Sequence, residues 1–291
     1  MSGGTVSVMN EKRFVDVDGA RMAYVERGTG RPIVLLHGNP TSSYLWRDVM
    51  PELEGLGRCL APDLIGMGDS AKVGGEYRFV DHRRYLDGFL RAVGVDSDVT
   101  LVLHDWGGGL GFDWANRHRD AVRAIAYMET IVQPVTWSDW PDDARRIFQA
   151  MRSEAGEEIV LEKNVFVERI LAASVLSPLS AAAHDEYRRP YLAGGESRRP
   201  TLTWPRQIPV DGEPADVHAI VTEYADWLAR SQVPKLFVNA DPGSILVGRQ
   251  REFCRTWPNQ QEVTVAGLHF IQEDSGREIG LAIAAFLGSL G

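Results

Sequence analysis

The stretch LVLHDWGGGLGF, residues 101–112, places the carboxylate of Asp105 between an apolar run and three consecutive glycines. Such a run predicts a buried strand, and the glycines permit a tight turn with close approach of a following helix. Parallel strands present functional side chains at their carboxyl ends, so Asp105 is a candidate for chemistry. The alternative is that Asp105 caps the N-terminus of the following helix. Taken alone, this stretch supports both interpretations equally.

A carboxylate at this position can carry out a reaction that a serine cannot. A serine that displaces a leaving group from a saturated carbon forms an ether, which a histidine-activated water does not readily cleave. A carboxylate forms an ester, and water can attack its carbonyl carbon and regenerate Asp105. An aspartate here therefore fits displacement at an sp³ carbon, with a covalent intermediate between two steps.

Histidine titrates near neutrality, so a histidine is the expected base for activating the water. His269 follows the apolar run EVTVAG near the end of the sequence. His104 points away from Asp105 along its strand and is expected to be a buried structural residue, and His37 is expected to support its own loop. No HExxH or other tight metal-ligand spacing occurs, so no metal site is predicted.

The elements that position these residues alternate along most of the chain. Strand patterns occur in a hairpin around Asp18-Gly19 and in RPIVLLHG, RCLAP, VTLVLH, VRAIAYMET, KLFVN and QQEVTVAG. Helical patterns occur in DHRRYLDGFLRAVGV, GLGFDWANRHRD and REIGLAIAAFLGSL. This alternation predicts an α/β fold with a mostly parallel, doubly wound sheet.

The alternation stops between about Gln133 and Pro214, where helical patterns, prolines and aromatic residues occur with little strand signal. We therefore predict that residues 133–214 form a helical cap. The cap is inserted into an α/β core made of residues 1–132 and 215–291.

Composition narrows the class of protein. The 291 residues carry a net charge of -9 without a basic tract, so neither nucleic acid nor a membrane surface is an expected partner. No apolar run approaches the roughly 18 residues that span a bilayer. Two cysteines make no disulfide framework and no zinc ligand set. No signal-peptide pattern is visible, so we expect a cytoplasmic protein, either a monomer or a weak homo-oligomer.

Several motifs together carry a specific resemblance to a known family. They are HGNPTSSYLW (37–46), DLIGMGDS (63–70), HDWGG (104–108), YMET (127–130), TWPRQIP (203–209), FCRTWPNQ (253–260) and HFIQED (269–274). From about residue 14 onward, the chain resembles the haloalkane dehalogenases of the α/β-hydrolase superfamily. The resemblance implies an α/β-hydrolase fold with a cap and a cofactor-independent hydrolase. That enzyme uses water to convert a haloalkane to an alcohol, a halide (chloride or bromide) and a proton through an alkyl-aspartate ester.

The resemblance also assigns roles to individual residues. It implies that Asp105 is the nucleophile and His269 the general base. The indole N–H of Trp106 and the side-chain amide of Asn39 would hold the halide. The backbone N–H groups of Asn39 and Trp106 would form the oxyanion hole for ester hydrolysis.

The acid that orients His269 has two candidates. Position alone slightly favours Asp241, which follows the strand KLFVN. The resemblance is to the branch of the family that uses a glutamate after the preceding core strand, which matches Glu129 in AYMET. We therefore predict Glu129, with Asp241 as the alternative.

An apolar substrate cavity is implied as well, since a haloalkane offers little to hydrogen-bond except its halogen. The predicted lining residues are Trp140, Pro141, Phe148, Met151, Phe166, Ile170, Ser174, Trp204, Pro205 and Ile208 from the cap, and Ile245, Leu246 and Phe270 from the core. Two places depart from the family pattern. Gly108-Gly109 stands where Ser-Ala is frequent, and Ser174 stands where a larger apolar residue is common. We hypothesise that the small Ser174 widens the entrance to the cavity.

Other functions remain open on the sequence. An epoxide hydrolase shares the aspartate nucleophile but usually protonates its substrate through cap tyrosines, here only Tyr187 and Tyr191. A coelenterazine luciferase shares the Asp-Glu-His set. A small-molecule receptor on the same fold would have no need of a halide clamp. The stretch GMGDSA (66–71) matches a dinucleotide fingerprint, although a loop pattern rather than a helix follows it.

Overall fold

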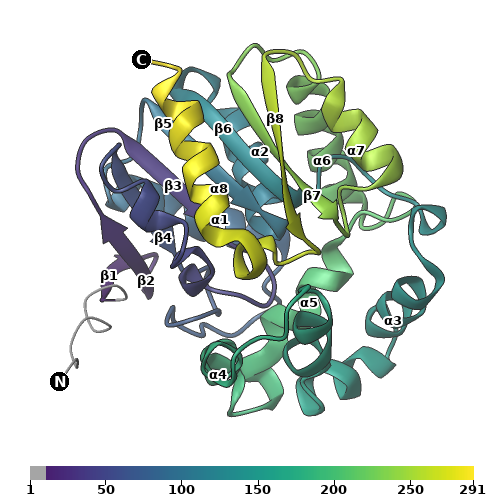
Figure 1. Ribbon diagram of the computed structural model, residues 1–291. Coiled ribbons are helices and arrows are strands. Elements are labelled where there is room, and N and C mark those ends of the chain that lie inside the picture. The colour runs from purple at the N-terminus through teal and green to yellow at the C-terminus, as the bar shows by residue number, and fades with distance from the viewer. Residues whose placement is uncertain (1–10) are drawn as a thin grey trace.

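The centre of the structure, a computed structural model that describes residues 11–291, is an eight-stranded sheet (Figure 1). Its strands are β1 (Lys12–Val17), β2 (Ala20–Arg27), β3 (Pro32–Leu36), β4 (Arg58–Pro62), β5 (Val99–His104), β6 (Val122–Thr130), β7 (Lys235–Pro242) and β8 (Gln260–Gly267). The spatial order is β1-β2-β4-β3-β5-β6-β7-β8, with β2 antiparallel to both neighbours and all other pairs parallel. The predicted α/β class, mostly parallel sheet and hairpin are confirmed.

Helices cover both faces of this sheet. They are α1 (Phe79–Ala92), α2 (Asp105–Arg117), α6 (Ala215–Leu228), α7 (Gly248–Arg255) and α8 (Ile271–Gly288). Along β5, Leu101 and Leu103 pack in one hydrophobic cluster with residues of α1, α2 and α6, whereas Val102 packs in a second cluster with residues of α8. Successive side chains of a strand point to opposite faces, so one apolar strand supplies both layers.

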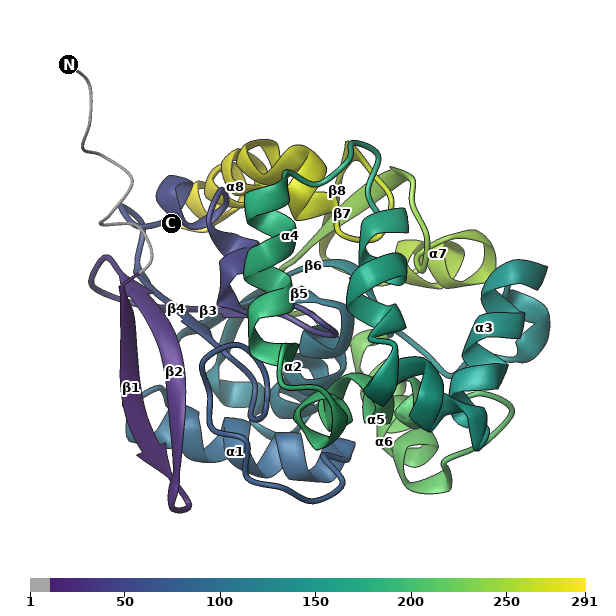
Figure 2. The same cartoon turned by 90° about the horizontal axis from the view of Figure 1, so that it is seen from below.

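The segment between β6 and α6 is helical. It contains η4 (Trp137–Asp139), α3 (Asp142–Arg152), the π-helical segments η5 (Glu157–Glu162) and η6 (Phe166–Leu171), α4 (Ala181–Arg188) and α5 (Arg199–Gln207). Its labelled helices lie together on one side of the sheet (Figures 1 and 2). The two ends of the segment meet, because Val135 pairs with Val210 in an isolated bridge. The sequence patterns did not distinguish the π-helical segments from α-helix.

The DLIGMGDS motif forms a loop, and the next helix starts only at Phe79, so the geometry of a dinucleotide fingerprint is absent there. Its buried Asp63 organises the loop instead. The Asp63 carboxylate accepts the backbone N–H groups of Ser43 and Asp69, at 2.8 Å each, and pairs with Lys12 Nζ at 2.6 Å.

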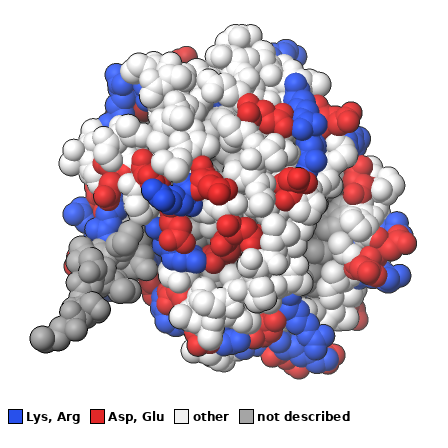
Figure 3. Space-filling model, viewed as in Figure 1, with Lys and Arg blue, Asp and Glu red and all other residues white. Residues whose placement is uncertain are grey.

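Charged side chains of both signs are intermingled on the face that Figure 3 shows. Within residues 11–291, no helix combines the length and apolar character needed to cross a membrane. The first ten residues of the predicted core, and the expectation about a signal peptide, lie outside the described part of the chain.

Candidate active site

Asp105 lies at a sharp turn between β5 and α2, and its φ of 50° falls in the left-handed region. Neighbouring glycines make room for this turn. A Cβ at Gly107 would lie 2.1 Å from the Leu36 carbonyl oxygen, and a Cβ at Gly38 would lie 2.0 Å from Asp105 Oδ1. The N-cap position of α2 is His104, and the Asp105 carboxylate accepts an N–H from Asn39 in the loop after β3, which a purely capping role would not require. Strain of this kind is characteristic of functional sites.

The two oxygens of the Asp105 carboxylate have different surroundings. Oδ1 accepts the backbone N–H of Asn39 at 2.7 Å. The backbone N–H of Trp106 also stabilises this carboxylate. Oδ2 lies 3.4 Å from His269 Nε2. The backbone donors thus orient the carboxylate, and Oδ2 faces the imidazole.

Glu129 lies on the other side of the His269 ring, with its Oε2 3.6 Å from Nδ1. Its side chain is fully buried at the end of β6, and its φ is 39°. Asp241 is exposed at the end of β7. The structure therefore brings Glu129, and not Asp241, into contact with His269.

The loop after β7 holds the Glu129 carboxylate. Three consecutive backbone N–H groups donate to it, from Ser244 (3.1 Å), Ile245 (2.7 Å) and Leu246 (3.2 Å). These hydrogen bonds satisfy the buried oxygens of the Glu129 side chain and fix its orientation. Ile245 and Leu246, predicted as cavity residues, thus contact the site through their backbones.

The three ionisable groups influence one another strongly. Burial alone would raise the pKa of Asp105, but the hydrogen bond and the charge of His269 outweigh burial and lower it. Burial alone would lower the pKa of His269, but Asp105 and Glu129 together raise it to about 9. At neutral pH the raised pKa of His269 therefore favours the imidazolium form beside Asp105.

The side chains of Asn39 and Trp106 both contact helix α5. Asn39 Nδ2 donates to the carbonyl oxygen of Thr201 at 3.3 Å. The Trp106 indole stacks on Trp204 with ring centroids 4.5 Å apart, and Trp204 stacks in turn on buried His82 at 4.2 Å. The predicted halide donors are thus positioned by the segment predicted to be the cap.

The other residues predicted to line the cavity make several different kinds of contact. Phe270 packs its ring edge-on against His269 at 4.5 Å, and the Ser174 carbonyl accepts the backbone N–H groups of both residues. Trp140, Phe148 and Phe166 form a chain of ring contacts that starts beside Pro141. The remaining members lie in or beside the helices between β6 and α6. Met151 belongs to a hydrophobic cluster against which Ile170 packs, and the carbonyls of Pro205 and Ile208 accept hydrogen bonds from Arg152.

Two residues that support the site were not singled out as site residues from the sequence. His104, expected only to be structural, lies against His269 at 4.7 Å between ring centroids, and its Nε2 bonds the His269 carbonyl at 2.8 Å. Thr130 Oγ1 donates to the Asp105 carbonyl at 2.6 Å. A Cβ at Gly108 would lie only 1.7 Å from that hydroxyl. In the sequence, the unusual glycine at position 108 could have indicated a close contact with another segment, and the structure shows that this segment contains Thr130.

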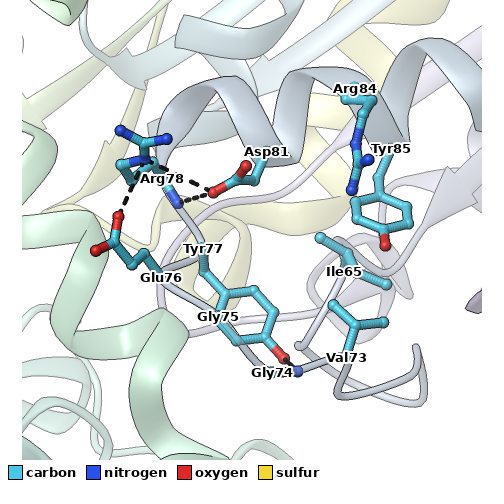
Figure 4. A pocket seen from close by; sticks show the side chains of 10 residues that line it. All are labelled: Ile65, Val73, Gly74, Gly75, Glu76, Tyr77, Arg78, Asp81, Arg84 and Tyr85. Atoms are coloured by element: carbon cyan, nitrogen blue, oxygen red, sulfur yellow. Dashed lines mark hydrogen bonds and ion pairs between the residues drawn. The ribbon is translucent and has the colours of Figure 1, made fainter.

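A separate hollow of about 350 Å³ opens beside the N-terminus of α1 (Figure 4). Its walls are Ile65, Val73, Gly74, Gly75, Glu76, Tyr77, Arg78, Asp81, Arg84 and Tyr85. Arg78 is already paired with Glu76 and Asp81. None of the predicted site residues lines it. Across residues 11–291, no group of three or more His, Cys, Asp or Glu side chains is arranged to hold a metal ion.

The chain belongs to the α/β-hydrolases, because a family model described as the alpha/beta hydrolase fold matches residues 31–276. A haloalkane dehalogenase of Sphingobium indicum is 60% identical over 284 residues, which are 96% of each chain. One of Mycolicibacterium smegmatis is 52% identical over 281 residues, 94% of this chain and 90% of the relative. Within the α/β-hydrolases, the chain therefore belongs to the haloalkane dehalogenase family.

Solved structures agree with this assignment. The crystal structure of a haloalkane dehalogenase from Bradyrhizobium elkani has a TM-score of 0.92 at 40% identity, covering 96% of this chain and 98% of that one. A reconstructed ancestral haloalkane dehalogenase has a TM-score of 0.92 at 42% identity, covering 96% and 99%. These relatives favour neither the epoxide hydrolase nor the luciferase alternative.

The contact between Gly108 and Thr130 predicts that the two positions are energetically coupled. Gly108→Ser should lower the free energy of unfolding by about 1–3 kcal/mol, because the new Cβ displaces the Thr130 hydroxyl from the Asp105 carbonyl. Thr130→Ala should relieve part of that loss in the double variant, because it removes the hydroxyl 1.7 Å from the new Cβ but keeps the Cβ of residue 130, which lies 2.6 Å away. Gly109→Ser is the matched control, since its Cβ would meet nothing closer than 3.2 Å and its effect should add to that of Thr130→Ala. Denaturant unfolding of the six proteins measures the coupling, and additivity at position 108 would contradict it.

The charge arrangement predicts how His269 titrates. Its pKa is raised to about 9, so the stabilisation from this group is complete below about pH 6.5 and is lost as the pH rises through 9. Asp105→Asn removes one of the two carboxylates and should lower the pKa of His269. NMR titration of the imidazole signal measures the shift. The difference in free energy of unfolding between the wild type and Asp105→Asn should also shrink as the pH rises from 6.5 to above 9. If the pKa of His269 is the same in both proteins, Asp105 does not raise it and this charge arrangement is refuted.

Proposed function

We propose that this protein hydrolyses haloalkanes to an alcohol, a halide and a proton. The observation that carries the proposal is the Asp105 carboxylate, whose Oδ1 is bound by the Asn39 N–H while Oδ2 faces His269. The names of the similar proteins from Sphingobium indicum and Mycolicibacterium smegmatis support it independently. No cofactor enters the proposed reaction.

In the first step, Asp105 attacks the carbon that bears the halogen. A bond forms between a carboxylate oxygen and that carbon, and the carbon–halogen bond breaks with both electrons leaving on the halide. The indole N–H of Trp106 and the amide N–H of Asn39 are proposed to bind the departing halide. Both side chains are buried, at 2% and 3% exposure, so their hydrogen bonds act with little competition from water.

In the second step, ester formation activates the base. The ester has no negative charge, so one of the two interactions that raise the pKa of His269 disappears, while burial continues to lower it. The imidazolium then releases its proton to solvent, which is the proton that the overall reaction yields. The neutral imidazole accepts a proton from water, with Glu129 stabilising the imidazolium that forms again. The resulting hydroxide attacks the ester carbonyl carbon, and negative charge develops on the oxygen held by the Asn39 N–H. Collapse releases the alcohol and restores Asp105.

Residues 133–214 are proposed to act as a cap over this site. The bridge between Val135 and Val210 at its two ends supports that division. Its aromatic residues, with Phe270 from the core, are proposed to form the apolar cavity for the alkyl group. The proposed partners are therefore a small haloalkane, water, and chloride or bromide. A cytoplasmic protein, monomeric or weakly self-associating, remains the proposal for its cellular state.

Halide release from 1-bromobutane or 1,2-dibromoethane tests the function. The wild type should release bromide with turnover, and Asp105→Ala should abolish release because no nucleophile remains. His269→Phe should still form the ester but lack the base, so its mass should increase by the alkyl group without turnover. A wild type that releases no halide from several bromoalkanes would overturn the proposal.

The acid that orients His269 is tested by a pair of isosteric changes. Glu129→Gln removes the buried charge beside Nδ1 and should lower kcat by about 10²-fold or more, within the range for acid–base partners. Asp241→Asn alters an exposed side chain and should leave kcat near that of the wild type. The reverse pattern in steady-state halide release would reassign the role to Asp241.

A further inference from the structure

Helix α5 carries a proline in its interior, Pro205. In an α-helix each backbone N–H bonds the carbonyl four residues earlier, which for residue 205 is that of Thr201. Proline has no N–H, so α5 cannot complete this hydrogen bond. A buried carbonyl left in this way needs a donor from elsewhere.

The donor that reaches the Thr201 carbonyl is the side-chain amide of Asn39, at 3.3 Å. Asn39 is 3% exposed and Thr201 is fully buried, so bulk water does not reach this contact freely. Asn39 Oδ1 has no hydrogen-bond partner among residues 11–291. The Thr201 carbonyl therefore determines which end of the Asn39 side-chain amide, the nitrogen or the oxygen, faces α5. It attracts the nitrogen and repels the oxygen.

Two side-chain hydrogen bonds join helix α5 to residues at the start of α1. Thr203 Oγ1 donates to the Glu76 carbonyl at 2.6 Å, and Gln207 Oε1 accepts the Phe79 N–H at 3.0 Å. The ring of Trp204 stacks on Trp106 between these two contacts. The Thr201 carbonyl, which has no N–H partner at position 205, is thus held at a defined place relative to the side chains of Asn39 and Trp106, the two proposed halide donors.

The Pro205 carbonyl is also bound by a side chain from another segment. It lies in the last turn of α5, which ends at Gln207, so it has no N–H partner within the helix. Arg152 Nη1 donates to it at 2.9 Å.

We propose that Pro205 is a positioning residue for the halide-binding amide of Asn39. By withholding an N–H from the Thr201 carbonyl, it leaves that oxygen to bind one amide hydrogen of Asn39. The same contact turns the amide nitrogen, with its second hydrogen, toward halide binding. This inference rests on the proposed function of Asn39 and adds a residue that acts through it.

The test uses two variants, one that introduces a backbone N–H at position 205 and one that lacks both this N–H and the proline ring. In Pro205→Ala, the new N–H bonds the Thr201 carbonyl and competes with the Asn39 amide for it, which weakens the hydrogen bond that orients Asn39. We expect the Kd for bromide, measured by tryptophan fluorescence with sodium bromide alone, to rise about tenfold. We also expect kcat to fall more for an alkyl chloride than for the matching bromide. Alanine favours the helix interior over proline, so the variant should fold.

A second variant separates the N–H from the proline ring. Lactic acid incorporated at position 205 has the methyl group of alanine but an ester oxygen in place of the N–H. It should restore the bromide affinity of the wild type. Pro200→Ala is the matched control, because Pro200 lies in the first turn of α5, where an N–H has no helical acceptor.

The outcomes separate this inference from the proposed function. If the wild type releases bromide from 1-bromobutane and Pro205→Ala binds bromide equally well, the role of Pro205 is refuted while the function stands. If the lactic acid variant behaves like Pro205→Ala, the ring and not the missing N–H matters, and the inference is again refuted. A wild type without halide release would remove the function and this inference together.

Discussion

The constraint on which the site depends is the burial of charge. Two carboxylates and an imidazole lie together out of water, and each would be costly there alone. Asp105 follows β5, Glu129 is the next-to-last residue of β6 and His269 follows β8, so the sheet must bring these strand ends together. Backbone N–H groups from the loops after β3 and β7 donate hydrogen bonds to the two carboxylates and offset the rest of the cost of burying them. The parallel order of the strands is what makes all these groups meet at one edge.

The segment between β6 and α6 is joined to this edge by polar contacts as well as apolar ones. The backbone N–H groups of Leu176 and Ser177 donate to Asp274 near the start of α8, and Tyr187 bonds Glu273 beside it. The Ser174 carbonyl binds the backbone of His269 itself. A movement of this segment would therefore displace His269 through the hydrogen bond from its backbone N–H to Ser174.

Much of the fold follows from the sequence, because strands buried on both faces are continuous apolar runs and Asp18-Gly19 is a strong turn signal. The contact of Glu129 with His269 could not be derived from pattern alone. Glu129 and Asp241 both stand at strand ends, and only the path of the loop after β7 decides between them. The π-helical segments differ from α-helix by one residue per turn, which leaves no clear periodic signature. The role of Thr130 depends on the missing Cβ of Gly108, a contact between two segments far apart in the sequence.

That pairing also restricts how such a protein can change over generations. A side chain at position 108 displaces the Thr130 hydroxyl, and it also meets the Cβ of residue 130 at 2.6 Å, which every residue except glycine keeps. A change at position 130 therefore eases a later change at position 108 without removing the conflict. A lineage that has acquired a larger residue at 108 loses stability if threonine returns at 130. The order of mutations, and not only their number, separates sequences that share this elbow.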